Sequence, residues 1–309
     1  MEIIMTASKI RIIPCNLRLF LYSLLLVVYS ANAAVYTLGD SLSDAGSLGF
    51  TYTNPSSVTP LISGKVWVQN LTESTPAFCN SQKSCLLNSQ TYYYTNPGNN
   101  FAVGGAGVTF NSTDADVKQN YTNLHSQIYA LTHGRKLHTD DSVTVWMGAN
   151  DILAAAKHPA TSRAVVINAA AVFYNEVSNL TKFNLGTKFY VITIPDLGTT
   201  PFGIISAKSI LLSELTAIFN NIGISGLKIM PNVYLINSDI LFNQLSQTFN
   251  SSTLYCSVIV DPSHICGDLK TNPINPYPGS IPLLFADPIH PSDATHRYIS
   301  NLPELKSIH

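Results

Sequence analysis

Four short apolar runs recur along the chain, separated by long stretches with helical periodicity. The runs are rich in strand-forming residues and lie at residues 35–38, 142–147, 188–194 and 232–236. Between them, residues 160–180 and 207–227 place apolar side chains three or four positions apart, as an amphipathic helix does. Strands that alternate with helices in this way are typical of an α/β domain with a parallel sheet.

Two regions lack this periodicity. Residues 50–100 and 247–281 are rich in serine, threonine, asparagine and proline, and the first also contains many aromatic residues. Long stretches of this composition within a compact domain are usually functional loops or disordered segments. No internal repeat or heptad pattern interrupts the rest. We therefore predict one domain over residues 34–309, with loop insertions near 50–100 and 247–281.

The N-terminal 33 residues have the pattern of an export signal. Lys9, Arg11 and Arg18 form a basic start, Leu19 to Tyr29 is almost wholly apolar, and Ala31-Asn32-Ala33 suits cleavage after small residues. The apolar stretch is shorter than the roughly 20 residues that cross a bilayer, and we expect no later segment to span one. The pattern predicts a mature chain that begins at Ala34 and is secreted, with periplasmic or surface-associated retention as the alternative.

Charge and cysteine content further limit the kinds of partner and bound metal that the chain could have. Without the predicted signal the chain keeps 14 basic and 17 acidic residues, a formal charge of −3, which argues against nucleic acid as a partner. It also keeps four cysteines, an even number that favours disulfides in an exported protein. Three pairings are possible, and we favour the two local ones, Cys79–Cys85 and Cys256–Cys266. A zinc site is disfavoured because the ligand spacing is wrong.

A serine and an Asp-x-x-His sequence suggest nucleophilic chemistry. Ser41 follows the apolar run 35–38 and Gly39-Asp40, so we expect it at the carboxyl end of a strand, where open α/β sheets place reactive groups. A serine hydroxyl needs a base, and the base needs an orienting group. His290 and Asp287 supply both types. The alternative is a plain turn before a helix that Ser292 caps.

Acyl chemistry also needs donors for the negative charge that develops on the substrate carbonyl oxygen. The backbone N–H groups of Ser41 and Gly105 and the side-chain amide of Asn150 are the candidates for this oxyanion hole. A tight turn at Gly104-Gly105 and a helix cap at Asn150 are the structural alternatives. We interpret Asp40 and Asp151 as hydrogen-bonding supports of the loops.

No cofactor or metal ion is predicted. The histidines outside the Asp-x-x-His sequence have no ligand-like spacing, and the glycines do not complete a phosphate-binding or dinucleotide-binding fingerprint.

The four chemistry-bearing segments together resemble, in order, the sequence blocks of the GDSL or SGNH lipase and acylhydrolase family. They are Gly39-Asp40-Ser41-Leu42, Gly105, Gly148-x-Asn150-Asp151 and Asp287-x-x-His290-Pro291. The resemblance implies a flavodoxin-like three-layer α/β/α sandwich with a central parallel sheet. It also implies Ser41, Asp287 and His290 as catalytic residues, and Ser41, Gly105 and Asn150 as the oxyanion hole.

Within this family, the chain looks most like exported bacterial lysophospholipases, phospholipases and glycerophospholipid:cholesterol acyltransferases, the Legionella PlaA-like group. The resemblance implies a lipid substrate, most of all a lysophospholipid, with a sterol acceptor as an option and peripheral contact with a lipid surface. Aromatic residues of the first insertion would wall an acyl pocket or belong to the core: Tyr52, Trp67, Phe78, Tyr92, Tyr93 and Tyr94. A carbohydrate acetylesterase and a catalytically silent binding protein remain as alternatives.

The loop between Cys256 and Cys266 precedes Asp287 in the sequence. It has three interpretations: a cover over the site, a segment that is cut during maturation, or a structural staple.

Overall fold

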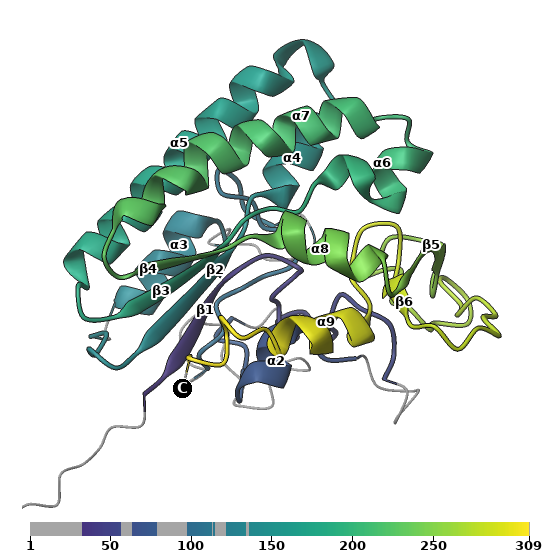
Figure 1. Cartoon of the computed structure of the whole chain (residues 1–309), viewed down its shortest axis with the longest axis horizontal. Coiled ribbons are helices and arrows are strands. Elements are labelled where there is room, and N and C mark those ends of the chain that lie inside the picture. The colour runs from purple at the N-terminus through teal and green to yellow at the C-terminus, as the bar shows by residue number, and fades with distance from the viewer. Residues whose placement is uncertain are drawn as a thin grey trace, which may run out of the picture. The chain divides into compact units, whose positions relative to one another are not determined.

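The four apolar runs form one parallel sheet (Figure 1). The computed structural model describes residues 33–56, 64–78, 98–112, 114, 122–133 and 136–308. The strands are β1 (Val35–Gly39), β2 (Ser142–Trp146), β3 (Lys188–Ile192) and β4 (Val233–Ile236), which are neighbours in that order. All three pairings are parallel, and every residue of β2 is buried. The predicted strands are confirmed, with ends that differ by up to two residues.

A further segment lies along the free edge of β1. Phe101 donates to the Thr37 carbonyl over 2.8 Å, and Val103 donates to the Gly39 carbonyl over 3.2 Å. Thr37 and Asn100 also form a parallel bridge. If this irregular edge is counted as the second strand of the chain, the spatial order becomes 2-1-3-4-5, which is the flavodoxin-like order. The predicted fold class is therefore confirmed.

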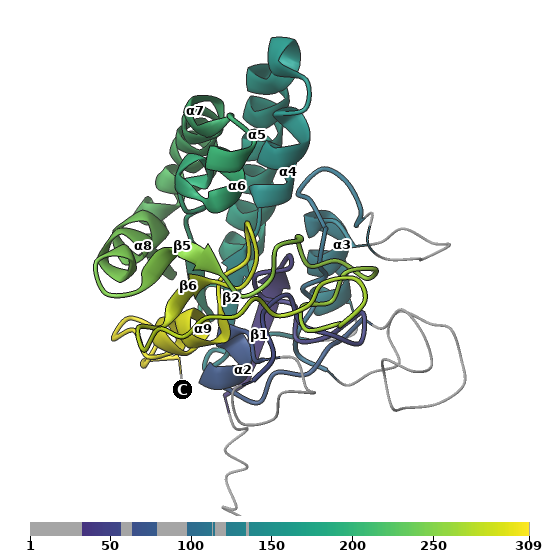
Figure 2. The same cartoon turned by 90° about the vertical axis from the view of Figure 1, so that its right-hand side faces the viewer.

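Helices cover both faces of the sheet, so the domain has three layers. In Figure 1, α5 and α7 lie on one side of the strands, and α2, α8 and α9 lie on the other; Figure 2 again shows α2 beside α9. The helices are α2 (Trp67–Leu71), α3 (Leu124–Thr132), α4 (Ala149–Ala155), α5 (Pro159–Phe183), α6 (Pro201–Ile205), α7 (Ser209–Phe219), α8 (Ser238–Ser246) and α9 (Asp293–Ser300). The two helices predicted from periodicity correspond to α5 and to the segment that starts with α7.

The face that α5 turns to the core explains its formation. Val166, Ala169, Ala170, Phe173 and Val177 are all buried and recur at three- and four-residue spacing. Its Phe173 ring meets the Phe219 ring of α7 edge-on, with centroids 5.6 Å apart. Burying this stripe stabilises the long helix far more than its intrinsic propensity does.

The helical segment Ser209–Ile229 continues α7 through a π turn and a 3₁₀ turn. Its length and mean hydropathy are sufficient for a membrane span, so the expectation that no later segment would qualify is wrong on those criteria. Five of its apolar side chains are instead fully buried in the core of the domain: Leu212, Leu215, Phe219, Ile224 and Leu227.

Residues 247–281 are mostly irregular but contain a strand. β5 (Asn250–Leu254) pairs with β6 (Leu283–Phe285), and β6 ends just before Asp287. The predicted Cys256–Cys266 disulfide is present. Cys79 and Cys85 lie outside the described residues, as do residues 1–32 of the predicted signal sequence, Tyr92, Tyr93 and Tyr94.

A substitution at Gly148 tests how closely the connection between β2 and α4 is packed. It has φ of 130°, and a side chain there would overlap the Phe219 ring. We expect Gly148→Ala to lower the free energy of unfolding by about 3 kcal/mol, because backbone strain and overpacking add. Gly46→Ala is the matched control, since Gly46 also has positive φ but its nearest neighbour is 3.8 Å away; it should cost about 1 kcal/mol. Equal losses in urea denaturation would contradict this account.

Candidate active site

Ser41 lies in a turn at the carboxyl end of β1. The last residue of the strand, Gly39, is fixed by the Gln127 side chain, which accepts from its N–H and donates to its carbonyl, both over 2.8 Å. Within the turn, the Asp40 carboxylate accepts from Leu42 N–H over 3.1 Å, and Ser43 N–H donates to the Asp40 carbonyl. Ser41 is thereby held at the edge of the sheet with little exposed surface.

His290 and Asp287 lie in line with this serine. The His290 Nε2 atom is 2.9 Å from Ser41 Oγ, although the two residues are 249 positions apart. His290 Nδ1 is 2.7 Å from Asp287 Oδ2. An ionised carboxylate only accepts, so Nδ1 carries the proton and Nε2 is free to accept from the serine hydroxyl. The structure therefore brings the three predicted residues into the order that activates a serine nucleophile.

The Asp-x-x-His turn also precedes a helix, so this sequence forms both the Asp–His pair beside Ser41 and the turn before a capped helix. Ser292 caps α9 by accepting from Thr295 N–H over 3.1 Å. A second sequence of the same spacing, Asp261-x-x-His264, also forms an Asp–His contact, of 2.9 Å. Its side chains are 40% exposed, whereas those of Asp287 and His290 are 0% and 8% exposed. Burial beside Ser41, and not the spacing, distinguishes the two pairs.

The surroundings of His290 make its side chain a stronger base than a free imidazole. Burial lowers the pKa of His290, but the negative charge and the hydrogen bond of Asp287, together with the charges of Asp40 and Asp114, raise it, and the balance lies above the ordinary value of 6.5. The imidazolium that would form during proton transfer is thus stabilised by a carboxylate already in place.

Three candidate donors face one cavity beside Ser41. Ser41, Gly105 and Asn150 all line it. In the part of the chain that the structure describes, no acceptor is bonded to the backbone N–H groups of Ser41 and Gly105. Asn150 uses one side-chain N–H to bond the Ala106 carbonyl over 3.0 Å, which leaves its second N–H for a ligand. These groups can stabilise an oxyanion.

The structural alternatives for these donors have different outcomes. Gly105 does lie in a turn with φ of 72°, and a Cβ there would come within 2.8 Å of Asp114 Cγ, so glycine is needed for the turn as well as for access. Asn150 is not a helix cap: Gly148 occupies the N-cap position of α4, and no side chain caps it.

Buried carboxylates hold the loops around the cavity. Asp44 accepts from Ser47 and from Gly104 N–H over 2.8 Å, and Asp151 accepts from Val108 N–H over 2.7 Å and from Thr109. Burial raises the pKa of both groups. Asp40 accepts from Leu42, but its buried Oδ2 atom has no hydrogen-bond partner among the residues that the structure describes. The supporting roles predicted for Asp40 and Asp151 are confirmed by these bonds.

The cavity itself has a volume of about 530 Å³ and mostly apolar walls. Apolar side chains that line it are Leu42, Leu153, Leu197, Phe202, Phe242, Phe285 and Ile289. Tyr52 also lines it, with its ring centroid 5.2 Å from that of His290 and its hydroxyl donating to Asp114 over 2.9 Å. Trp67 and Phe78 belong to the main core, so of the described aromatic candidates only Tyr52 walls the cavity.

Two supporting groups have no distinctive sequence signal. Val260 donates its backbone N–H to Asp287 Oδ2 over 2.6 Å, and Gln127 holds the end of β1. A backbone donor leaves no trace in the side-chain sequence, and a lone glutamine on a helix is usually solvated. Only the folded chain shows what they contact.

Comparison of the sequence with known protein families agrees with this arrangement. The sequence model of the GDSL-like lipase/acylhydrolase family matches residues 35–302. "Lipase 1" of Photorhabdus luminescens is 25% identical over 170 residues, which are 54% of this chain and only 23% of the relative, so the chain spans about a quarter of that protein. Among solved structures, Est24, a carbohydrate acetylesterase from Sinorhizobium meliloti, is 12% identical with a TM-score of 0.42, over 87% of this chain and 94% of that chain.

Asp287→Asn tests the role of the carboxylate. Loss of its charge removes the main group that raises the pKa of His290 and stabilises its charged form. We expect kcat for p-nitrophenyl acetate to fall about 10³- to 10⁴-fold. The pH midpoint of kcat/KM, above 6.5 in the wild type, should move to lower pH. His264→Gln alters the exposed pair of the same spacing at a residue that does not line the cavity, and it should leave both quantities nearly unchanged; a similar loss in that control would contradict the assignment.

The raised pKa of the buried Asp40 carboxyl makes folding stability depend on pH. Burial raises the pKa of Asp40 to about 7, from 3.8. The folded protein therefore binds a proton that the unfolded chain has released, and folding stability should fall as pH rises from about 4 to about 7. Asp40→Asn keeps an acceptor for Leu42 and removes the titration. Urea denaturation at pH 5 and pH 8 should show a smaller pH effect in the variant than in the wild type; an equal effect would refute this origin.

Proposed function

Because the chain belongs to the GDSL-like lipase/acylhydrolase family, we propose that it is an exported serine ester hydrolase that releases fatty acids from lipids, above all from lysophospholipids. The observation that carries the proposal is the largely apolar cavity of about 530 Å³ that opens beside the Ser41–His290–Asp287 arrangement. Its walls suit an acyl chain, and its reactive groups suit an ester carbonyl.

The reaction follows from the hydrogen bonds at the site. Ser41 Oγ attacks the ester carbonyl carbon while His290 Nε2 takes the hydroxyl proton. The carbonyl oxygen becomes an oxyanion that Ser41 N–H, Gly105 N–H and the Asn150 amide stabilise. His290 then gives its proton to the leaving alcohol, and an acyl ester on Ser41 remains. Water, deprotonated by His290, releases the fatty acid and restores the serine.

The geometry of α4 supports an acyl chain along one cavity wall. Leu153 and Ala154 follow Asn150 by three and four residues, so they lie on the same helix face, and all three line the cavity. An acyl group whose carbonyl oxygen contacts Asn150 would pass along these apolar side chains. A short acetyl group would leave most of this surface unused.

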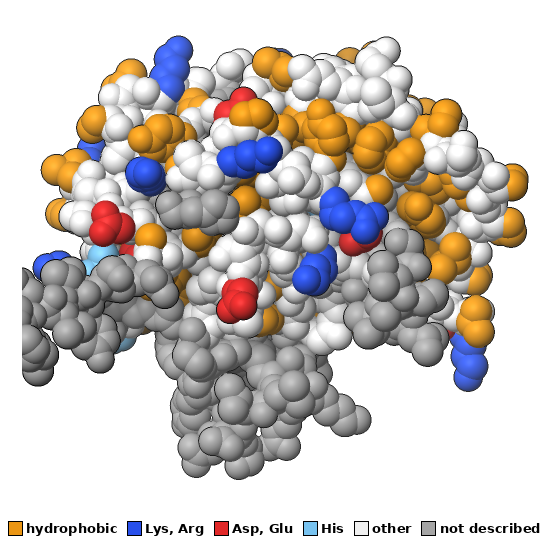
Figure 3. Space-filling model, turned by 60° about the horizontal axis from the view of Figure 1, so that its bottom comes forward, with side chains coloured by type: hydrophobic (Ala, Val, Ile, Leu, Met, Phe, Trp, Pro, Cys, Tyr) orange, Lys and Arg blue, Asp and Glu red, His pale blue; other side chains and the backbone are white. Residues whose placement is uncertain are grey.

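Exposed apolar residues near the cavity and two lysines that line it both support a phospholipid as the substrate. Phe202 of α6 lines the cavity, while Ile204 and Ile205 on the same helix are 65% and 72% exposed. Figure 3 shows hydrophobic side chains gathered over the upper right part of one face, with charged side chains scattered singly. Lys157 and Lys208 also line the cavity and supply positive charge for a headgroup phosphate. Lysophospholipids leave micelles readily, so shallow contact with a lipid surface is sufficient.

Export is part of the proposal. The basic and then apolar N-terminal segment supports a cleaved signal, and the Cys256–Cys266 disulfide suits an oxidising compartment. We place the mature enzyme outside the cell or in the periplasm.

A lipid panel tests the proposed substrate. We expect the mature wild type to release fatty acid from lysophosphatidylcholine faster than from a monoacylglycerol with the same chain, because only the former carries a phosphate. Ser41→Ala should release none, as measured by mass spectrometry. Sterol in parallel reactions detects acyl transfer through sterol ester. Cleavage of acetyl esters alone would contradict the lipid assignment in favour of a carbohydrate acetylesterase, and no product from any ester would favour a silent binding protein.

Ala154→Phe tests the path of the acyl chain in the same assay. The added ring would fill the cavity beyond Asn150, so kcat/KM for a long-chain ester should fall about tenfold or more relative to that for an acetyl ester. Ala160→Phe places the same ring on the exposed start of α5, away from the cavity, and should not change this ratio. An unchanged ratio in Ala154→Phe would show that the chain takes another path.

A further inference from the structure

The Asp287 carboxylate accepts four hydrogen bonds. Its Oδ1 atom accepts from the backbone N–H groups of Ile289 and His290, both over 2.7 Å. Its Oδ2 atom accepts from His290 Nδ1 over 2.7 Å and from the backbone N–H of Val260 over 2.6 Å. Three of these donors belong to the turn 287–290. The fourth comes from a residue 27 positions earlier, so it is the one that ties the carboxylate to a different part of the fold.

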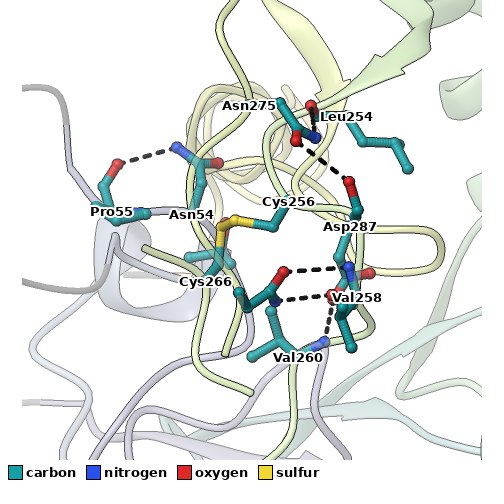
Figure 4. The surroundings of a disulfide bond; sticks show 12 residues. Asn54, Pro55, Leu254, Cys256, Val258, Val260, Cys266, Asn275 and Asp287 are labelled. Atoms are coloured by element: carbon teal, nitrogen blue, oxygen red, sulfur yellow. Dashed lines mark hydrogen bonds between the residues drawn. A yellow bond between two sulfur atoms is a disulfide. The ribbon is translucent and has the colours of Figure 1, made fainter. Parts of the chain in front are cut away.

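Val260 lies in the loop that the Cys256–Cys266 disulfide closes. Figure 4 shows Val260 and Asp287 side by side near the two sulfur atoms. Both ends of the loop are buried, as is Val260 itself, which is 1% exposed. Together with Phe50 and Tyr52 they form a second hydrophobic cluster, separate from the main core. Tyr52 extends this cluster to the His290 ring.

Hydrogen bonds hold the loop at both ends as well. Cys256 N–H donates to the carbonyl of Ala286, the residue before Asp287, over 2.7 Å. The fully buried Asn272 side chain accepts from Val258 N–H over 3.1 Å and donates to the Val258 carbonyl over 2.8 Å and to the His264 carbonyl over 3.1 Å. The loop is thus fixed on either side of Val260, whereas the short strands β5 and β6 alone would leave its tip free.

We infer that the Cys256–Cys266 loop is a positioning element of the active site: Val260 N–H fixes the Asp287 carboxylate opposite His290, and the disulfide fixes Val260. The three hydrogen bonds within the turn 287–290 fix the carboxylate only relative to the backbone of that turn. The turn itself is held by Phe202 N–H, which donates to the Pro288 carbonyl over 2.8 Å. The bond from Val260 is the one that ties the carboxylate group itself to another part of the fold. This role goes beyond a staple that only adds stability, and it rests on the ester hydrolysis proposed above, whatever the lipid.

Val260→Pro and Val260→Ala test the inference as a matched pair. Proline removes the N–H and alanine keeps it, while both lose the valine side chain. With p-nitrophenyl acetate, which has no long acyl chain to bind, we expect Val260→Pro to lower kcat about tenfold or more, because a hydrogen bond to a charged group is lost. KM should stay within about twofold of the wild type. Val260→Ala should retain most of kcat.

The double variant Cys256→Ala/Cys266→Ala tests the disulfide independently and decides the matter if Val260→Pro does not fold. We expect a cooperative melting transition at lower temperature, and, at a temperature where the protein is folded, the same fall in kcat with little change in KM. A purely structural disulfide would lower the melting temperature and leave kcat unchanged, which would overturn the inference. So would folded Val260→Pro with wild-type kcat, or equal losses in Val260→Pro and Val260→Ala.

Failure of the proposed function gives a different result. If the wild type cleaves no ester, the hydrolase proposal itself is wrong. The positioning role is refuted when the wild type is active and the variants match it.

Discussion

The parallel arrangement of the sheet is the constraint on which the site depends. Because β1 to β4 all run in one direction, the segments that follow them emerge at the same edge. Ser41 lies in the turn that follows β1. Asn150 lies in the first turn of α4, which Gly148 connects to the end of β2. His290 comes from outside this sheet, after β6, and its contact with Ser41 over 2.9 Å joins the C-terminal turn to the edge. An antiparallel neighbour would separate these groups by the length of a strand.

Holding the groups there requires polar atoms in places that water does not reach. Asp44 and Asp151 are buried, and each accepts several hydrogen bonds from the loops that it organises. Asp40 is the exception, since one of its oxygens has no hydrogen-bond partner in the described part of the chain, and burial raises its pKa to about 7. Desolvated carboxylates of this kind cost stability, but they keep the backbone donors of the oxyanion hole pointed at the cavity. The hydrogen bonds that organise the site therefore come at a cost in the free energy of folding.

Much of this was predictable from the sequence. Apolar runs located the strands, because a buried parallel strand must be apolar on both faces. The irregular edge at residues 99–103 has no strand signal, because its two asparagines and the glycines that flank it at 98, 104 and 105 are typical of a loop. The chemistry of their residue types made Ser41, Asp287 and His290 candidates, the resemblance of the four segments to a known family implied their roles, and the structure brings them into contact. Spacing alone would not have sufficed, since Asp261 and His264 form the same contact at the surface. The Val260 donor had no signal, because every residue except proline carries that N–H.

Labelling with a fluorophosphonate probe, followed by intact-protein mass spectrometry, tests the central claim most directly. The account predicts one adduct per wild-type molecule, located on Ser41, none in Ser41→Ala, and a rate that is strongly reduced in His290→Ala because the serine has lost its base. An adduct of equal stoichiometry in Ser41→Ala, or a wild-type labelling rate in folded His290→Ala, would contradict it.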